Sequence, residues 1–265
     1  DLRMAAQKIR FDDGAAYERM MGIWSRGVGE DFLDWLNLPK GLKCVDVGCG
    51  NGAFTELLVE RCRPVEVQGI DPSSEQIAFA RTRHTAKIAE FRQADAMALP
   101  FPDSRFDAAT MALVIFFVPE PAKGVAEMAR AVRRGGAVAA YAWDMLGGGF
   151  PMTPILSEVR ALGKETVGPP SVEASRMESL RELWGNAGLE AVETRKITVQ
   201  RTFRNFDDFW TTSTGAGSVR ATVDALSRDE VETVKARLRA KLLPDAEGRI
   251  THSAFANAIK GRVRK

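Results

Sequence analysis

Short apolar runs alternate with helical patterns through the first half of the chain. Five runs predict buried strands, because each is almost continuously apolar and is bounded by turn residues: 42–47, 65–70, 88–91, 106–117 and 137–143. Before the last of these, residues 121–132 place apolar side chains at helical spacing. Repeated strand–helix alternation favours parallel pairing with right-handed crossovers. The pattern therefore predicts an α/β fold with a doubly wound, mostly parallel, Rossmann-like sheet.

The pattern is less regular after residue 144. Glycines and prolines in residues 145–175 predict an irregular insertion, and residues 203–245 predict helices, one of them opened by a capping box at Ser227. Strands are expected at 190–199 and 248–263, which gives the sheet seven strands.

The pattern predicts one domain over residues 1–265. Its ligand-binding core would cover residues 42–144, after an N-terminal helical cap at residues 1–38 that is rich in aromatic side chains. The insertions at 145–175 and 203–245 would act as helical lids over a substrate.

Composition and charge narrow the function classes. Lys+Arg total 37 against Asp+Glu 35, and a formal charge of +2 argues against a protein that holds nucleic acid by its phosphates. The longest near-apolar run, residues 108–118, is too short to span a bilayer, and residues 1–4 have no apolar signal core. The three cysteines lack metal-ligand spacing, so neither a disulfide framework nor a metal site is expected. We therefore expect a cytoplasmic protein that is not integral to a membrane.

A glycine-rich turn follows the first predicted strand. Gly48, Gly50 and Ala53 match the pattern Gly-x-Gly-x-x-Ala, in which glycines let a ligand approach the backbone closely. Alone, this match is compatible with a dinucleotide site, and a tight strand–helix turn that binds nothing stays open as an alternative.

Carboxylates at the ends of three predicted strands add to this turn. Asp46 lies two residues before Gly48, Asp71 ends the second strand, and Asp95 ends the third. A carboxylate in the second position accepts from ribose hydroxyls, and one in the third can accept from an exocyclic amine. A dinucleotide site explains Asp71 but neither Asp46 nor Asp95. As an alternative, Asp71 and Asp95 could each cap the helix that follows.

Several strings of residues carry a resemblance to a known family: 45–52, 69–73, 93–96 with 99–101, 106–107 and 130–136. In order and spacing they resemble the class I S-adenosylmethionine-dependent methyltransferases, and the resemblance covers residues 42–143. They are most similar to the small-molecule branch that includes the ubiquinone/menaquinone C-methyltransferases. Residues 17–26 resemble a segment that precedes the core in relatives of that branch.

The resemblance implies S-adenosylmethionine as the cofactor and S-adenosylhomocysteine as its product. Gly48 and Gly50 would lie against the methionine part, with N–H groups free for its carboxylate, and Asp46 would contact the amino-acid end. Asp71 would bind the ribose hydroxyls, and Asp95 would accept from the adenine amine. Further cofactor contacts are expected from Asn51, Pro72, Gln76, Ala96 through its N–H group, Met111, Tyr17, Trp24 and Arg26. For Arg26, a plain surface position is equally compatible with the sequence.

The end of the fifth strand would lie beside the transferred methyl group. Asp144 and Tyr141 are candidates for a general base there, although Asp144 is also compatible with a solvated turn. Aromatic residues would line the acceptor site: Phe117, Trp143, Phe150 and Trp210. Of Phe116 and Phe117, we expect one in the core and the other in the wall of the pocket.

These expectations favour an enzyme that transfers a methyl group from S-adenosylmethionine to a carbon, oxygen or nitrogen atom of a small, apolar or aromatic molecule. Two alternatives stay open: a non-catalytic S-adenosylmethionine-binding or regulatory module, and a nicotinamide-dependent oxidoreductase. His84 is expected on the surface of the helix after Asp71, and His252 in a structural role, so placement rather than imidazole chemistry would drive the reaction. The expected partner is the small-molecule acceptor, without nucleic acid, and the chain is expected to be a monomer or homodimer.

Overall fold

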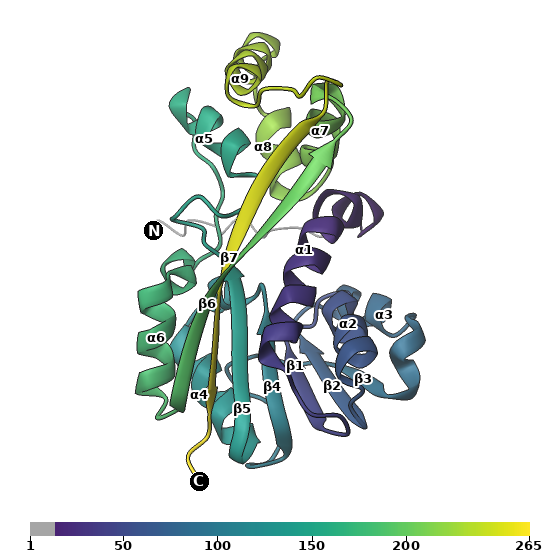
Figure 1. The fold of residues 1–265 in the computed structure, drawn as a ribbon, viewed down its shortest axis with the longest axis vertical. Coiled ribbons are helices and arrows are strands. Elements are labelled where there is room, and N and C mark those ends of the chain that lie inside the picture. The colour runs from purple at the N-terminus through teal and green to yellow at the C-terminus, as the bar shows by residue number, and fades with distance from the viewer. Residues whose placement is uncertain (1–13) are drawn as a thin grey trace, which may run out of the picture. The chain divides into compact units, whose positions relative to one another are not determined.

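The computed structural model describes residues 14–265, which contain a seven-stranded sheet. Its strands are β1 (Lys43–Val47), β2 (Glu66–Asp71), β3 (Ala89–Gln93), β4 (Phe106–Ala112), β5 (Val132–Trp143), β6 (Glu190–Phe203) and β7 (Ile250–Arg262). Their order across the sheet is β3-β2-β1-β4-β5-β7-β6 (Figure 1). The pairs β3–β2, β2–β1, β1–β4 and β4–β5 are parallel, whereas β7 runs antiparallel to β5. The predicted α/β fold with a doubly wound, mostly parallel sheet is confirmed.

Helices connect the strands. They are α1 (Gly14–Leu36), α2 (Ala53–Cys62), α3 (Ser74–Ala80), α4 (Pro121–Ala131), α5 (Thr153–Ala161), α6 (Met177–Asn186), α7 (Phe206–Ser213), α8 (Gly217–Asp224) and α9 (Arg228–Lys241). Short 3₁₀ turns lie at η1 (His84–Lys87), η2 (Ile115–Phe117) and η3 (Val172–Ser175). Within the described residues, no helix combines the length and the apolar character needed to cross a bilayer.

The chain forms two compact units. The first, called the sheet unit below, comprises Arg26–Gly149, Pro169–Thr198 and Phe255–Lys265. The second, called the aromatic unit, comprises the described residues up to Ser25 with Phe150–Gly168 and Val199–Ala254. α1, β6 and β7 therefore contribute residues to both units. The single domain expected from the sequence stays a prediction.

Within the sheet unit, helices cover both faces of the sheet. Tyr141 of β5 packs against Phe32 of α1 and Phe54 of α2, with ring centroids 4.5 and 5.8 Å apart. Met111 of β4 points to the opposite face, where its methyl group lies 3.7 Å from the place of a Cβ on Gly124 of α4. Neighbouring strand residues alternate between the faces. This double cover explains why β1, β2 and β4 are almost entirely buried.

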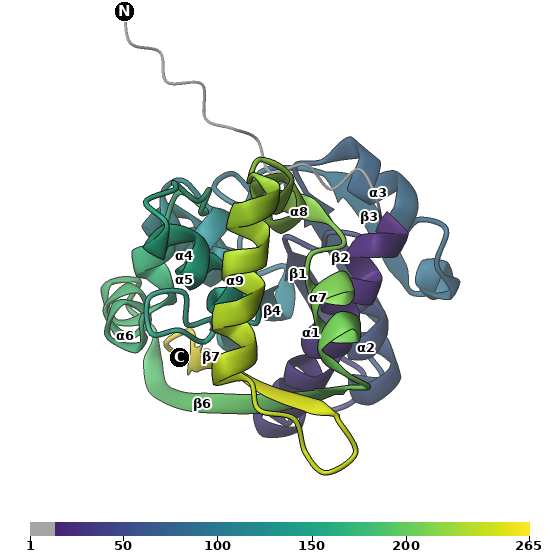
Figure 2. The ribbon, with the colours of Figure 1, turned by 90° about the horizontal axis from the view of Figure 1, so that it is seen from above.

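Within the aromatic unit, α5 packs against α9 (Figure 2). Glu158 of α5 is 4% exposed and is paired with Lys241 and Arg237 of α9. Ser227 opens α9 with a reciprocal capping box to Glu230, as the sequence predicts. A buried acid that is paired with two cations ties the two helices together.

The predicted strand at 106–117 is wrong beyond Ala112. Leu113 adopts a φ of 58°, and its N–H donates to Tyr141 O at 2.8 Å, so the chain leaves the sheet and turns into η2. Apolar residues continue through this turn because Ile115 and Phe116 are buried there. A continuous apolar run therefore conceals the end of the strand.

The structure also differs from the sequence prediction in two helical segments. The irregular insertion predicted at 145–175 contains α5, whose first turn includes Pro154, a position where proline is compatible with a helix. His84, expected on the helix after Asp71, lies in η1 instead, because α3 ends at Ala80. In the first case the sequence prediction missed a helix, and in the second it placed the end of a helix too late.

Candidate functional site

The turn after β1 is shaped by glycines with positive φ. Gly48 and Gly50 have φ values of 76° and 52°, a region that other residues rarely adopt. A Cβ on Gly48 would lie 2.5 Å from Val114, whereas a Cβ on Gly50 would meet no heavy atom within 4 Å. Gly48 is therefore required by packing, and the backbone at Gly50 borders open space that a ligand can fill.

Asp71, the last residue of β2, is held by two backbone N–H groups. Gly50 N–H donates to Oδ2 at 3.0 Å, and Ser73 N–H donates to Oδ1 at 2.9 Å. Burial raises the pKa of Asp71, and these two hydrogen bonds oppose the rise. Each carboxylate oxygen keeps a further lone pair, so the side chain is suited to accept from two neighbouring hydroxyl groups.

The N–H groups of the turn are largely used within the protein. Gly48 and Cys49 N–H donate to Ile70 O at 2.8 and 2.9 Å, and Gly50 N–H donates to Asp71. The expectation that Gly48 and Gly50 offer free N–H groups is therefore wrong in this structure. The turn closes onto the end of β2, and its donors fix the backbone and the Asp71 carboxylate.

Asp46 of β1 is fully buried beneath the turn. Thr55 Oγ1 of α2 donates to its Oδ2 at 2.6 Å, but Asp46 Oδ1 has no partner among the described residues. Thr110 of β4 lies opposite Asp46 in register, and its Oγ1 is likewise buried without a described partner. Burial raises the pKa of Asp46 to about 7, with a smaller contribution in the same direction from Asp71. Two orphaned buried oxygens mark a position where a bound group would gain hydrogen bonds.

Asp95 lies next to Asp71 at the same edge of the sheet. β2 and β3 are paired up to Asp71 and Gln93, and Ala94 N–H donates to Asp71 O at 3.1 Å. Asp95 is exposed, and its Oδ1 accepts from Met97 N–H at 2.8 Å. The structure therefore brings together the glycine turn and the three carboxylates that the sequence singled out, at the carboxyl ends of adjacent strands.

Residues 45–140, which span β1 to β5 and carry this arrangement, match a family model described as a methyltransferase domain. Residues 45–140 of the chain therefore carry a methyltransferase domain. The family resemblance seen in the sequence is thereby confirmed.

Curated relatives and solved structures agree with this assignment. The fatty-acid O-methyltransferase of Mycolicibacterium smegmatis is 38% identical over 97 residues, covering 37% of this chain and 35% of the relative. The demethylmenaquinone methyltransferase of Bacillus licheniformis is 37% identical over 109 residues, covering 40% of this chain and 47% of the relative. The chain thus spans about a third to a half of the length of these relatives.

One solved structure illustrates the likeness in fold. The phosphoethanolamine N-methyltransferase 2 of Haemonchus contortus, in complex with S-adenosyl-L-methionine, superposes with a TM-score of 0.56 at 16% identity. The superposition covers 94% of this chain and 56% of that one. At this identity the likeness concerns the fold of the methyltransferase domain.

Other expected cofactor residues of the methyltransferase domain begin its helices. Asn51 Oδ1 accepts from Ala53 N–H at 3.0 Å at the start of α2, and Gln76 N–H donates to Ser73 Oγ at 3.3 Å at the start of α3. Pro72 O accepts from Gln93 Nε2 at 2.9 Å. These contacts are structural, and they hold Asn51, Pro72 and Gln76 beside the turn and the Asp71 carboxylate.

Three other predicted site residues lie in the packed core of the sheet unit. Met111, Tyr141 and Trp143 are each no more than 2% exposed. Burial raises the pKa of Tyr141 well above its ordinary value, so its hydroxyl stays protonated. The structure therefore contradicts a role for Tyr141 as a base and gives no surface to Met111 or Trp143. All three residues lie in strands that are apolar on both faces, and the helices that cover both faces of the sheet explain this apolar character.

The sequence leaves two alternatives open: a base or a turn residue for Asp144, and core or pocket wall for Phe116 and Phe117. Asp144 Oδ1 accepts from Gly147 N–H at 2.8 Å, and its backbone O accepts from Gly149 N–H at 2.8 Å, so Asp144 organises a turn. Phe116 is 4% exposed and Phe117 is 36% exposed. Phe116 is therefore the core residue of the pair, and Phe117 is the one available to a ligand.

Arg26 belongs to a surface ion-pair network. Its Nε lies 3.0 Å from Glu30 and its Nη2 lies 3.6 Å from Glu60, with 61% of its side chain exposed. The structure thus favours the surface alternative for Arg26 over a contact with the cofactor carboxylate.

The remaining predicted residues belong to the aromatic unit: Tyr17, Trp24, Phe150 and Trp210. Trp24 is 1% exposed and meets the ring of His252 edge-on at 5.7 Å. Trp210 is partly exposed and carries Lys235 Nζ over its ring at 5.3 Å. His252 Nε2 lies 3.1 Å from Pro151 O, which fits the structural role expected for this imidazole.

Sequence reasoning missed two groups that complete the site. Thr55 and Thr110 supply the only side-chain oxygens placed beside Asp46 by the described hydrogen bonds and strand register. Glu127 and Arg130 of α4 hold the loop that follows Asp95. Threonine in a strand or helix gives no signal in a single sequence, whereas the Glu–Arg spacing of i, i+3 on one helix is a readable ion-pair pattern.

Proposed function

We propose that this chain transfers a methyl group from S-adenosylmethionine to a small apolar or aromatic molecule. The observation that carries the proposal is the Asp71 carboxylate, fixed by Gly50 and Ser73 N–H groups beside backbone that borders open space. This combination suits a ribose that approaches the backbone closely. It lies within the matched methyltransferase domain.

The hydrogen-bonding side chains fit the three parts of S-adenosylmethionine. Asp71 would accept from the ribose hydroxyls, and Asp95 would accept from the adenine amine next to it. Asp46 Oδ1 and Thr110 Oγ1, both buried without a described partner, would gain hydrogen bonds from the amino-acid end, directly or through water. The open face of Gly50 supplies the close approach that all three contacts need.

Placement rather than acid–base chemistry would carry the reaction. The cofactor supplies an activated methyl group, and the protein aligns it with the acceptor. Tyr141 is locked in the core as a neutral phenol, and Asp144 holds a turn, so neither side chain supports a role as general base. We therefore expect the chain to bind an acceptor whose reacting atom needs no buried base.

An apolar acceptor fits exposed apolar side chains that each unit carries by itself. Phe117 is 36% exposed in the turn after β4, and Leu146 is 45% exposed after β5. The aromatic unit presents Trp210 and Phe150 as partly exposed rings. Two relatives are named for fatty-acid and demethylmenaquinone substrates, both of which are apolar molecules. Burial of such a molecule against aromatic rings would be favourable.

The test is a screen of small acceptors, read by release of S-adenosylhomocysteine. Calorimetry with S-adenosylhomocysteine, S-adenosylmethionine and NAD comes first, since binding of the sulfur ligands and not of NAD is expected. Tighter binding of NAD would overturn the proposal in favour of an oxidoreductase. Binding of the sulfur ligands without methylated product from any fatty acid, quinol or phenol would favour the non-catalytic module.

Three finer expectations belong to the same proposal. We infer that the chain acts as a monomer or homodimer in the cytoplasm. We also infer that it has no nucleic-acid partner, because its formal charge is only +2. Light scattering tests the oligomeric state, and a gel-shift assay at low salt tests nucleic-acid binding.

A further inference from the structure

The loop between β3 and β4 has no helix or strand longer than an isolated bridge. It begins at Ala94, contains the bridge between Asp95 and Ala98, and ends where β4 starts at Phe106. Long loops without regular structure are uncommon inside compact domains and are often functional. Something outside the loop must therefore hold Asp95 and its neighbours in place.

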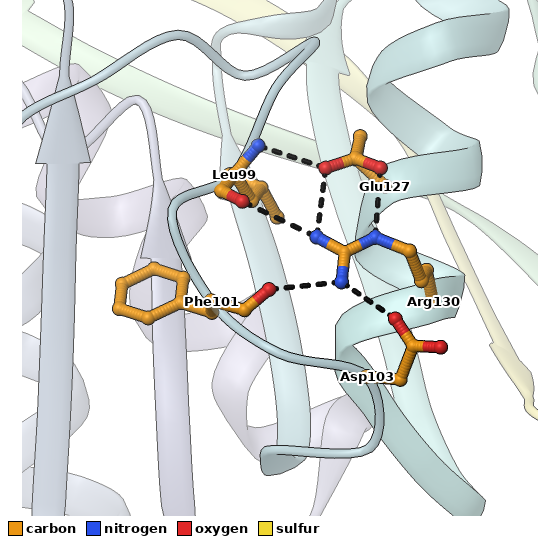
Figure 3. A network of polar contacts seen from close by, with 5 residues as sticks. All are labelled: Leu99, Phe101, Asp103, Glu127 and Arg130. Carbon is orange, nitrogen blue, oxygen red and sulfur yellow. Dashed lines mark hydrogen bonds and ion pairs between the residues drawn. The ribbon is translucent and has the colours of Figure 1, made fainter.

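Two side chains of α4 do so (Figure 3). The Arg130 guanidinium donates to Leu99 O at 3.2 Å and to Phe101 O at 2.8 Å, and it reaches Asp103 Oδ1 at 2.8 Å. Glu127 Oε2 accepts from Leu99 N–H at 2.8 Å. The loop backbone between Leu99 and Phe101 is thus pinned by one donor group and one acceptor group.

The two α4 side chains are themselves rigidly paired. Arg130 Nε and Nη2 lie 2.9 Å from the two carboxylate oxygens of Glu127, a bidentate ion pair between residues on one face of the helix. The hydrogen bonds from Arg130 lower the pKa of Glu127, so its carboxylate stays charged and keeps accepting from the loop. The fork geometry is one that lysine cannot reproduce.

The pinned segment starts directly after the turn that carries Asp95. Asp95 O accepts from Ala98 N–H at 3.1 Å, and Asp95 Oδ1 accepts from Met97 N–H at 2.8 Å, so Asp95 to Ala98 form one tight turn. Ala96 O lies 4.0 Å from the place of a Cβ on Gly124, which puts the turn against the same helix. The position of Asp95 therefore depends on α4 at both Gly124 and the Glu127–Arg130 pair.

We propose that Glu127 and Arg130 are positioning residues that set the selectivity of the cofactor site for the adenine base. The proposal rests on the proposed function, in which Asp95 accepts from the adenine amine. A base with an oxygen in place of that amine would present an acceptor to the Asp95 carboxylate, so it would be rejected only while Asp95 is held in place. When the loop is loosened, the preference for adenine over a base with oxygen falls by a larger factor than the affinity for the ribose and amino-acid parts of the cofactor.

The experiment measures two dissociation constants by calorimetry on the full chain. The ligands are S-adenosylhomocysteine and S-inosylhomocysteine, in which an oxygen replaces the amine of the base and the neighbouring ring nitrogen carries a hydrogen. We expect wild-type protein to prefer the adenine ligand by at least tenfold. Arg130→Met should lower this preference at least fivefold, Glu127→Gln should lower it less, and Arg130→Lys should retain part of it because the charge remains.

Two controls separate positioning from general loss of stability. Arg133→Met removes an arginine whose Nε lies 2.6 Å from Asp107 Oδ1 and which has no described contact with the loop, and it should leave the preference within twofold of wild type. Combined with Asp95→Ala, Arg130→Met should have no further effect on the preference, because both act through one carboxylate.

The outcomes distinguish this inference from the proposed function. Equal weakening of both ligands by Arg130→Met, with the preference intact, would show a merely structural role and overturn the inference. Wild-type protein that binds both ligands equally would also overturn it while leaving the cofactor assignment standing. Wild-type protein that binds neither ligand would overturn both. If Arg130→Met fails to fold, Glu127→Gln and Arg130→Lys, which keep size and shape more closely, decide the question by the same ratio.

Discussion

The sheet unit and the aromatic unit bury their polar groups in different ways. In the sheet unit, the carboxylates of Asp46 and Asp71 lie at strand ends and are held by a threonine hydroxyl and by backbone N–H groups. In the aromatic unit, the imidazole of His252 lies between the rings of Trp24 and Phe209. The first arrangement holds carboxylate oxygens with hydrogen bonds, and the second encloses an imidazole with aromatic rings that are each 1% exposed. The two units therefore differ in what surrounds these buried polar groups, hydrogen-bond donors in one and packed rings in the other.

The largest expected effect breaks the first arrangement. Asp71→Ala should weaken binding of S-adenosylhomocysteine at least 100-fold, or about 3 kcal/mol, because it removes the ribose acceptor and frees Gly50 N–H. Calorimetry measures the loss. Asp207→Ala, at a carboxylate that is 86% exposed in the aromatic unit, should bind as wild type does. Equal affinity in Asp71→Ala and wild type would contradict the assigned site.

The contrast between the units also shows what a single sequence can predict. Gly48, Gly50, Asp46, Asp71 and Asp95 are identified by spacing alone, because strand ends and tight turns are local in the chain. The strand order beyond β5 and the end of β4 at Ala112 depend on tertiary contacts.

The burial of aromatic residues is harder to predict from the sequence than the positions of the strand-end carboxylates. The end of the fifth strand predicts Trp143 as part of the acceptor site, but Trp143 is a core residue that is 2% exposed. An apolar side chain at a strand end has the same sequence pattern in both settings. The choice between Phe116 and Phe117 needed the turn at Leu113, whose φ of 58° has no signature in the sequence. Tertiary packing therefore decides which of these aromatic side chains are buried, and the local sequence pattern does not.

A second prediction concerns the buried acid of the sheet unit. The pKa of Asp46 is raised from an ordinary value of 3.8 to about 7, so the folded protein binds more protons than the unfolded chain between these values. The free energy of unfolding should therefore fall as pH rises from about 4 to 7, by up to about 1.4 kcal/mol per pH unit from this group, and level off above 7. Asp46→Asn should remove this slope in urea melts.

A carboxylate with the opposite shift provides the control for Asp46. Arg133 and Lys43 N–H keep the pKa of Asp107 below its ordinary value despite partial burial, so its contribution to stability is lost as pH falls. Asp107→Asn should therefore change the acid end of the profile and leave the slope between pH 5 and 7. Parallel profiles for wild type and Asp46→Asn across that range would show that Asp46 is not protonated in the folded protein.

A third prediction separates backbone strain from ligand contact. Gly50→Ala and Gly148→Ala both place a side chain at positive φ where no heavy atom lies within 4 Å, so both should cost about 1 kcal/mol of stability. Only Gly50→Ala should weaken binding of S-adenosylhomocysteine, by about tenfold, because its methyl group occupies space intended for the ligand. Thermal melts and calorimetry on the pair measure the two effects. Equal affinities in the two variants would place the cofactor away from Gly50.

The smallest expected effect concerns His252 of the aromatic unit. Its pKa is shifted in the opposite direction to that of Asp46, so its effect on stability has the opposite dependence on pH. Burial lowers the pKa of His252 below 6.5, although the contact with Pro151 O opposes this. The unfolded chain therefore takes up a proton first as pH falls below 6.5, and the folded protein loses stability on the acid side. His252→Gln should reduce this loss between pH 6.5 and 5, by less than about 1 kcal/mol, in urea melts.

Trp24→Phe is the matched variant for this last test. It keeps an aromatic ring beside the imidazole and removes an N–H group that has no acceptor among the described residues. The acid-side slope should therefore persist in Trp24→Phe and diminish in His252→Gln. If both variants lose the slope, packing of the aromatic unit rather than the charge of His252 controls its stability. Opposite slopes from Asp46 and His252 would instead show that these two groups make the stability of the folded chain respond to pH in opposite directions.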